Sequence, residues 1–299
     1  MAMVTGQLRI KEGFIPVPGG KVWFRTVGQG GVPLLCLHGG PGIPHDYLEN
    51  LEDLADRRMV VFYDQLGCGN SERPDDPSLW TIDRSIEELV AVRAHFGFDQ
   101  LHLFGNSWGG WLSLQYVLDR KPELLSLTLS SSPPSVRRWI EDANALRAKL
   151  PEDVRHVLDH HEAKQFFSCP EWFGAMAVFY RRHVCRADPW PDGVEQAFGP
   201  GFGAQVYGTM WGPSEFGPVT GNLKTWDVTD RLQEVKIPTL ITCGRFDEAT
   251  PEHVTDMHRR MPGSTLVIFE QSSHLAFVEE REAYIRTLDD FLDRVERAA

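Results

Sequence analysis

The sequence lacks the cysteine pattern of a disulfide framework or a structural zinc site. The chain has 299 residues but only five cysteines, and none of them form a Cys-x-x-Cys pair. An odd number of dispersed cysteines argues against paired bridges and against the usual zinc-ligand spacings. Reduced thiols in a reducing compartment fit best, so the composition predicts a cytoplasmic protein.

Basic charge and long apolar runs are also scarce. Lys and Arg total 30 against 42 Asp and Glu, which gives a formal net charge of −12. An acidic surface repels phosphate backbones, so general nucleic-acid binding is not expected. No apolar run approaches the roughly 18 residues of a membrane-spanning helix. The first residues, MAMVTGQLRIKEG, hold no apolar signal core. We therefore expect no membrane segment, and the oligomeric state is left open.

Short apolar runs alternate with helical stretches over most of the chain. Residues 8–28 predict a β-hairpin that turns at Gly19-Gly20. Buried-strand patterns and amphipathic helical patterns then alternate through residue 132, and the alternation resumes at residue 237. This order is typical of an α/β fold with a mostly parallel sheet and helices on both faces.

A segment of a different kind interrupts the alternation. Residues 134–232 are rich in aromatic residues, Pro and Gly, with helical pieces near 137–149 and 171–183. We predict that 134–232 forms a mostly helical cap, or lid, domain. Residues 1–133 and 233–299 would then form one catalytic domain, whose ligand crevice lies at the carboxyl ends of the strands.

The pentapeptide Gly105-Asn106-Ser107-Trp108-Gly109 matches the nucleophile motif G-x-S-x-G. Glycine and serine are common, so the pentapeptide alone is a weak signal. Here it lies between a predicted strand and a predicted helix, which is the context that the motif requires. The alternative is a glycine-rich strand-to-helix turn with an incidental serine. We favour Ser107 as a nucleophile.

A serine nucleophile needs a histidine base and a carboxylate that orients the base. Asp247 and His274 each follow a predicted strand, and they occur in the chain order Ser, acid, His. Either residue alone could be a helix cap or a satisfied polar group. Their order and their positions after strands make them candidates for a catalytic triad.

A glycine-rich loop, His38-Gly39-Gly40-Pro41-Gly42, follows another predicted strand. Stabilisation of an oxyanion needs two backbone N–H groups that point at one place. The N–H groups of Gly40 and Trp108 are the candidates for this oxyanion hole. The alternatives are an ordinary strand-end turn and a phosphate-binding nest. The chain has neither G-x-x-x-x-G-K-[ST] nor G-x-G-x-x-G, which argues against a nucleotide.

Two further patterns are weaker. Gly67-Cys68-Gly69-Asn70-Ser71 is similar to a nucleophile motif, but no convincing helix follows it, so we interpret it as a loop. His156 and His160 are spaced as i and i+4 on a predicted helix, with His161 and Glu162 beside them. No third ligand is evident, so a solvated helix face is favoured over a metal site.

Taken together, these motifs resemble the α/β-hydrolase fold, and more narrowly the prolyl aminopeptidase (proline iminopeptidase) family. The similarity spans about residues 15–295, and HGGPG with YDQxGxGxS is more specific than G-x-S-x-G. The insertion is most similar to the branch that contains the tricorn-interacting aminopeptidase and the L-amino-acid amidases. The segments that carry the resemblance are HGGPG (38–42), YDQLGCGNS (63–71), GNSWGG (105–110), WGPSEF (211–216), TWDVTDRL (225–232), GRFDE (244–248) and SSHLAF (272–277).

The resemblance implies a serine hydrolase that releases an N-terminal amino acid, proline or another small or hydrophobic residue. The substrate would be a short peptide or an amino-acid amide, and the reaction would need no metal or organic cofactor. Glu215 and Glu248 would bind the free α-amine of the substrate. Two alternatives remain, an L-amino-acid amidase and an ester or carbon–carbon bond hydrolase of the same fold.

Overall fold

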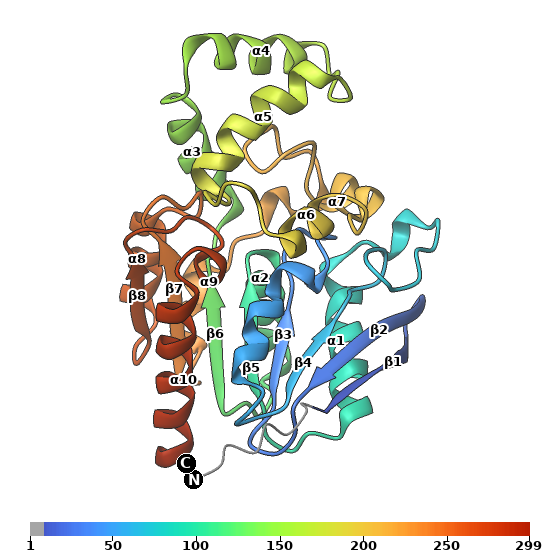
Figure 1. Cartoon of the computed structure of the whole chain (residues 1–299), viewed down its shortest axis with the longest axis vertical. Coiled ribbons are helices and arrows are strands. Elements are labelled where there is room, and N and C mark those ends of the chain that lie inside the picture. The colour runs from blue at the N-terminus through green and yellow to red at the C-terminus, as the bar shows by residue number, and fades with distance from the viewer. Residues whose placement is uncertain (1–8) are drawn as a thin grey trace.

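The computed structural model describes residues 9–299, so the part of the predicted hairpin at residue 8 and the start of the predicted catalytic domain lie outside it. An eight-stranded sheet with the order β1-β2-β4-β3-β5-β6-β7-β8 forms the centre of the molecule (Figure 1). β1 and β2 form the predicted hairpin, β2 is also antiparallel to β4, and the other pairs are parallel. The strands are β1 (Ile10–Val17), β2 (Gly20–Val27), β3 (Leu34–Leu37), β4 (Val60–Tyr63), β5 (His102–Asn106), β6 (Ser126–Ser130), β7 (Thr239–Gly244) and β8 (Thr265–Phe269).

Helices cover both faces of this sheet, as predicted, because the central strands are apolar on both sides. In β3, Leu35 and Leu37 pack into one core cluster, while Leu34 and Cys36 pack into the other. The first cluster includes residues of α1, α2 and α8, and the second includes residues of η1, α9 and α10. These elements are the 3₁₀ helix η1 (His45–Leu54) and the helices α1 (Ile82–Phe96), α2 (Trp108–Arg120), α8 (Pro251–Arg260), α9 (Ala276–Glu279) and α10 (Arg281–Ala298).

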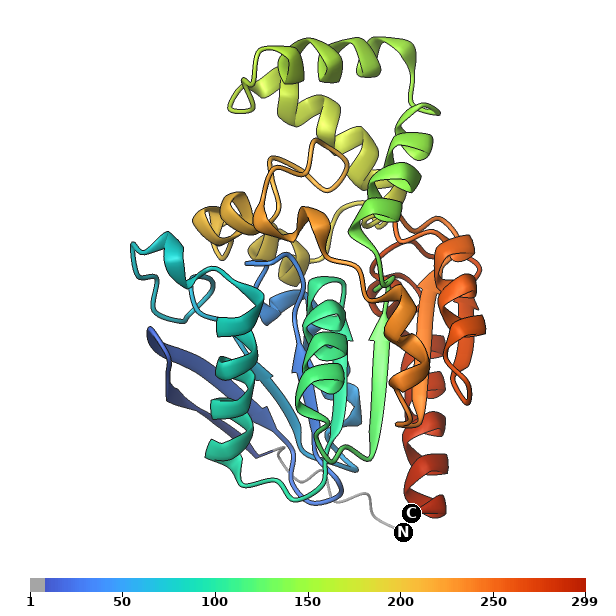
Figure 2. The same cartoon turned by 180° about the vertical axis from the view of Figure 1, so that it is seen from behind.

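The segment 134–232 lies over the carboxyl ends of the strands, at the top of Figure 1 and again in the reverse view of Figure 2. It holds α3 (Val136–Arg147), α4 (Glu152–Ala163), α5 (Pro170–His183), α6 (Asp192–Phe198) and α7 (Ala204–Met210). The sequence indicated α3 and α5 and treated residues 156–160, within α4, as helical, but it did not indicate α6 and α7. Both ends of the segment meet at its base, where Val136 N–H donates to Trp226 O at 3.0 Å and Val228 N–H donates to Pro134 O at 2.9 Å.

Four tryptophans join this segment to the sheet layer below. Trp111 of α2 packs against Trp139, Trp211 and Trp226, with ring centroids 5.5, 5.5 and 5.2 Å away. Large aromatic rings bury much apolar area, and their pairs prefer edge-to-face, tilted or offset-stacked contacts. The helical segment therefore rests on the helix that begins directly after Ser107.

All five cysteines are buried and unpaired. Among residues 9–299, no helix is both long enough and apolar enough to cross a membrane.

Candidate active site

Ser107 occupies a sharp turn between β5 and α2. Its backbone has φ 53° and ψ −123°, a left-handed conformation that a non-glycine residue adopts only when its surroundings enforce it. The neighbouring glycines make the turn possible: a Cβ on Gly105 would lie 2.4 Å from Gly109 O, and one on Gly109 would lie 2.2 Å from Leu37 O. The predicted strand-to-helix context of Ser107 is therefore present in full.

Asp247 and His274 follow β7 and β8 and form a buried pair. His274 Nδ1 lies 2.7 Å from Asp247 Oδ1, which also accepts the Ala249 N–H at 2.8 Å. Burial opposes a charge on the imidazole, but the carboxylate charge and hydrogen bond of Asp247 outweigh it, so the pKa of His274 is raised. This leaves Nε2 as the nitrogen that can accept a proton from outside the pair.

Ser107 and His274 line a single small cavity, together with Gly40, Glu215 and Glu248. Its free volume is about 10 Å³, which is roughly enough for one water molecule. The hydrogen bonds among residues 9–299 include none between Ser107 Oγ and His274; in empty sites such contacts are often long and tighten only around substrate. Five of the seven residues singled out from the sequence thus surround one cavity. A sixth, Asp247, is hydrogen-bonded to one of them, His274.

Two backbone N–H groups beside Ser107 are free to donate. Trp108 is the first residue of α2, so its N–H has no acceptor within the helix. In the preceding loop, Gly39 N–H donates to Tyr47 Oη at 2.7 Å, whereas no hydrogen bond among residues 9–299 uses the N–H of Gly40. Gly40 has φ 109°, and a Cβ there would lie 2.5 Å from Gly42 N, so only glycine fits.

Glu215 reaches the cavity from the segment above the sheet. Its Oε1 accepts the hydroxyl of Tyr207 at 2.7 Å, and its backbone carbonyl accepts Trp139 Nε1–H at 3.1 Å. Burial raises the pKa of Glu215 to about 7, although the Tyr207 hydrogen bond and the nearby His274 oppose the rise. Tyr207 and Trp139 therefore fix the direction of this carboxyl group, and nothing in the sequence indicated them.

Glu248 is the more unusual of the two carboxyl groups. It is 1% exposed, and neither of its carboxylate oxygens has a hydrogen-bond partner among the described residues. Burial raises its pKa well above the ordinary value, and the charges of Glu215 and Asp247 add to the rise. A buried carboxylate without a partner is destabilising unless a positive charge or N–H donors compensate it.

The C-terminal end of α5 holds the loops that carry Glu248 and His274. The carbonyl of His183 accepts the N–H of Glu248 at 3.2 Å and that of His274 at 3.3 Å, and Val184 O accepts Leu275 N–H at 3.2 Å. Sequence patterns could not indicate this contact, because backbone groups of any residue type can make it. The segment 134–232 thereby contributes to the position of the His–Asp pair.

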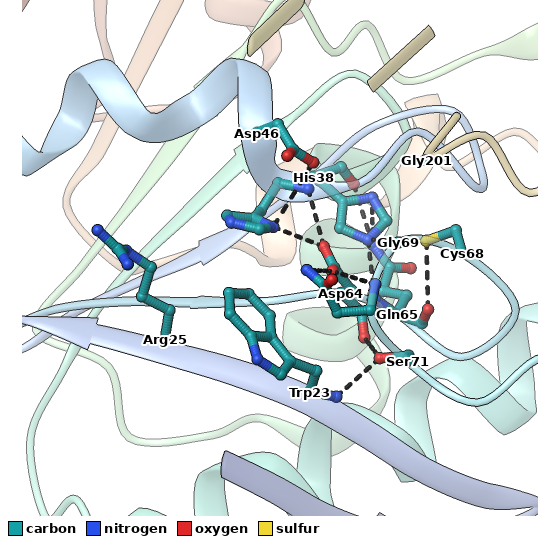
Figure 3. A network of polar contacts seen from close by, with 12 residues as sticks. Trp23, Arg25, His38, Asp46, Asp64, Gln65, Cys68, Gly69, Ser71 and Gly201 are labelled. Atoms are coloured by element: carbon teal, nitrogen blue, oxygen red, sulfur yellow. Dashed lines mark hydrogen bonds and ion pairs between the residues drawn. The ribbon is translucent and has the colours of Figure 1, made fainter. Parts of the chain in front are cut away.

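One cluster of side chains could hold a metal ion by its residue types, namely His45, Asp46 and Asp64. Figure 3 labels Asp46 and Asp64. Asp64 Oδ1 accepts the backbone N–H and Nδ1 of His45 at 3.0 and 2.7 Å, and Oδ2 accepts both nitrogens of Asn70. Burial favours neutral forms, but this pairing lowers the pKa of Asp64 and raises that of His45. We interpret the cluster as a buried ion pair of His45 and Asp64, because N–H groups already donate hydrogen bonds to both carboxylate oxygens of Asp64.

The two weaker sequence patterns have structural explanations. Ser71 Oγ donates to Asp64 O at 2.5 Å and accepts Trp23 N–H at 2.7 Å, so it fixes a loop (Figure 3). His156 and His160 lie on the exposed side of α4.

Comparison with known proteins identifies the family. Residues 32–281 match the family described as the alpha/beta hydrolase fold. The chain is 41% identical to the proline iminopeptidase of Heyndrickxia coagulans, over 95% of this chain and 99% of that protein. The chain belongs to the proline iminopeptidase family of α/β hydrolases. It is also 37% identical to the proline iminopeptidase of Saccharolobus solfataricus, over 96% of this chain and 94% of that one.

Two solved structures are similar over nearly the whole chain. The crystal structure of the Mycobacterium smegmatis proline iminopeptidase superimposes with a TM-score of 0.88 at 36% identity, covering 96% of this chain and 99% of that one. The crystal structure of VinJ has a TM-score of 0.91, also at 36% identity, with coverages of 95% and 99%. The expected α/β-hydrolase fold is confirmed, and the chain is a hydrolase.

Proposed function

We propose that this hydrolase releases the N-terminal amino acid of short peptides through an acyl-enzyme on Ser107, with proline as the first residue to test. The observation that carries the proposal is the pair of buried carboxyl groups, Glu215 and Glu248, in the same cavity as Ser107. An ester hydrolase has no need of two buried carboxyl groups there. Relatives that are 36–41% identical over nearly their whole length are named proline iminopeptidases, which supports proline at the N-terminus.

Acylation follows from the arrangement of the polar groups. His274 Nε2 takes the proton from Ser107 Oγ as that oxygen bonds to the substrate carbonyl carbon. The carbonyl electron pair moves onto oxygen, and the oxyanion accepts hydrogen bonds from the N–H groups of Gly40 and Trp108. The C–N bond breaks as the imidazolium of His274 gives its proton to the leaving amine. Water then attacks the acyl-enzyme with His274 again as the base, which releases the amino acid and restores Ser107.

The substrate α-ammonium group lies one Cα away from the carbonyl that Ser107 attacks. Its binding groups must therefore lie beside Ser107, where Glu215 and Glu248 are. Before a substrate binds, the raised pKa values of the two carboxyl groups mean that they do not both ionise readily. A bound ammonium supplies the missing positive charge and the N–H donors, and it favours the ionised form of both groups.

We expect the Glu215→Gln and Glu248→Gln variants to lower kcat/KM about ten- to a hundredfold on L-prolyl p-nitroanilide. Each loses a charge-assisted hydrogen bond worth about 1.5–3 kcal/mol. Hydrolysis of p-nitrophenyl acetate, which has no amine, should change much less. Glu52→Gln, which alters a carboxylate of η1 that is paired with Arg25 and does not line the cavity, is the matched control. Equal losses on both substrates would show that the carboxyl groups serve the fold or the His–Asp pair instead.

We further infer that residues 134–232 act as a cap domain over a catalytic domain of residues 1–133 and 233–299. Backbone hydrogen bonds between residues 134–136 and residues 226–228, at the two ends of the segment, support these boundaries. A substrate is larger than the single water that the cavity would hold, so the residues around it must rearrange to admit a substrate, and we infer that the cap is the part that moves. We place the reaction in the cytoplasm, because five unpaired thiols fit a reducing compartment.

The cap predicts a preference for short substrates. Under a cap, only a free chain end can approach Ser107, so turnover should decline from dipeptides to longer peptides, and folded proteins should resist cleavage. The measurement is the rate of proline release from a series of Pro-(Gly)n peptides, followed by mass spectrometry. Cleavage at internal positions of an unfolded protein would contradict a closed cap.

A further inference from the structure

Gln65 connects the loop of Gly40 to the helix of Trp108. It follows β4 and is buried, and its side chain spans the end of β3. Its Nε2–H donates to His38 O at 3.0 Å, and its Oε1 accepts the indole Nε1–H of Trp108 at 2.8 Å. A carbonyl can only accept and an indole N–H can only donate, so the orientation of the amide is determined. One side chain thus bonds to both segments that carry the proposed oxyanion donors.

The backbone N–H of Gln65 also bonds to the loop of Gly40, through the side chain of His38 (Figure 3). Its N–H donates to His38 Nε2 at 2.8 Å, so the imidazole proton resides on Nδ1, which lies 3.0 Å from Gly39 O. Burial lowers the pKa of His38 to about 4, so the ring stays neutral at neutral pH and keeps this tautomer. The peptide that precedes Gly40 is therefore fixed through His38 and Gln65.

The position of Gln65 is itself anchored by its neighbour. Asp64 is fully buried and accepts four hydrogen bonds from His45 and Asn70, and its own N–H donates to Trp23 O at 3.0 Å. These bonds fix the chain that leaves β4, as Figure 3 shows around Asp64 and Gln65. Gln65 therefore follows a residue that is held in place by several hydrogen bonds, and its own contacts can fix the position of the loop of Gly40 relative to the helix of Trp108.

We propose that Gln65 is a positioning residue that sets the separation and direction of the Gly40 and Trp108 N–H groups. Gln65 touches neither substrate nor oxyanion and acts through His38 and Trp108. Removing one oxyanion donor lowers kcat by about 10²- to 10³-fold, and donors must hold their geometry to within roughly 0.5 Å. The proposal rests on the proposed function, because it assumes that Ser107 forms a tetrahedral intermediate.

The first test is Gln65→Leu, assayed with p-nitrophenyl acetate and with L-prolyl p-nitroanilide. We expect kcat to fall about ten- to a hundredfold on both substrates by a similar factor, with KM nearly unchanged, since ground-state binding does not use the oxyanion hole. Affinity for phenylboronic acid, whose adduct with the serine is tetrahedral, should fall in parallel with kcat. Gln115→Leu is the matched control. The side-chain carbonyl of Gln115 accepts Trp226 Nε1–H at 2.9 Å, the same type of bond as that of Gln65 to Trp108, but Gln115 lies on α2 seven residues beyond Trp108.

A double-mutant cycle shows whether Gln65 acts through Trp108. Trp108→Phe keeps an aromatic ring but removes the indole donor, so it should slow both substrates by a smaller factor. If the bond transmits the effect, the double variant should be no slower than Gln65→Leu alone. Multiplicative losses in the double variant, or a Gln65→Leu kcat within twofold of the wild type, would overturn the proposal. If Gln65→Leu does not fold, Trp108→Phe carries the test, and a wild-type kcat there overturns it.

The failure of this proposal and that of the proposed function are distinguishable. If the enzyme does not recognise an α-amine, the wild type will hydrolyse amine-bearing and N-acetylated substrates alike. The p-nitrophenyl acetate arm and the boronate arm remain valid in that case, because both depend only on Ser107 and the oxyanion hole.

Discussion

Ser107→Ala is expected to remove nearly all turnover, with a loss in kcat of about 10⁶-fold, while the chain stays folded. The hydroxyl is the only part of Ser107 that the substitution removes, and the turn depends on backbone bonds such as Ser107 N–H to Ser130 O at 2.9 Å. The measurement is kcat on L-prolyl p-nitroanilide, with circular dichroism to verify the fold.

Labelling with a fluorophosphonate probe tests the assignment of Ser107 as the nucleophile without any substrate. It should label Ser107 in the wild type and nothing in the Ala variant. The matched control is Ser113→Ala, since Ser113 is a buried serine in α2 whose hydroxyl donates only to Gly109 O. Labelling that persists in Ser107→Ala, or that disappears in Ser113→Ala, would show that Ser107 has been wrongly assigned.

Asp247→Asn is expected to lower kcat by about 10³- to 10⁴-fold. Oδ1 of Asp247 accepts both His274 Nδ1–H and Ala249 N–H, so an amide oxygen can take its place and keep the same tautomer. What is lost is the negative charge that stabilises the imidazolium during proton transfer. Because that charge raises the pKa of His274, the acidic limb of the kcat/KM profile should also move to lower pH.

The matched control for this variant is Asp142→Asn. Asp142 Oδ2 lies 3.2 Å from Nδ1 of His253, which is a second His–Asp pair outside the cavity. We expect its removal to leave kcat and the pH profile nearly unchanged. An Asp247→Asn variant with kcat within tenfold of the wild type, or with an acidic limb at the wild-type position, would contradict the role of Asp247.

The sheet and the residues after its strands could be predicted because their signals are local. β3, β5 and β7 are short apolar runs that end at or near glycine, and such runs are typical of buried parallel strands. Parallel strands end at the same edge, so Ser107, Asp247 and His274 could be expected together although 167 residues separate the first from the last. The positions of α6 and α7 were missed, since each helix has only seven residues, too few to show a clear helical period. Their packing partners, such as η1 for α6, are far away in the sequence.

The contacts that orient the site could not be predicted from the sequence. Gln65 and Trp108 are 43 residues apart, and neither residue type in isolation indicates a partner. The carbonyl of His183 acts through long-range contacts that exist only once the segment 134–232 lies on the sheet, whereas the hydroxyl of Tyr207 meets Glu215 eight residues away within that segment. The role of Glu215 was implied only by the family resemblance, whereas the structure adds its burial and its proximity to Ser107.

The most direct test of the account is the ratio of kcat/KM for L-prolyl p-nitroanilide to that for its N-acetyl derivative. Acetylation removes the positive charge that Glu215 and Glu248 are proposed to bind, but it leaves the carbonyl group and the leaving group unchanged. We predict a wild-type ratio of about 10² or more, which falls at least tenfold in Glu248→Gln. A wild-type ratio near one would contradict recognition of a free α-amine.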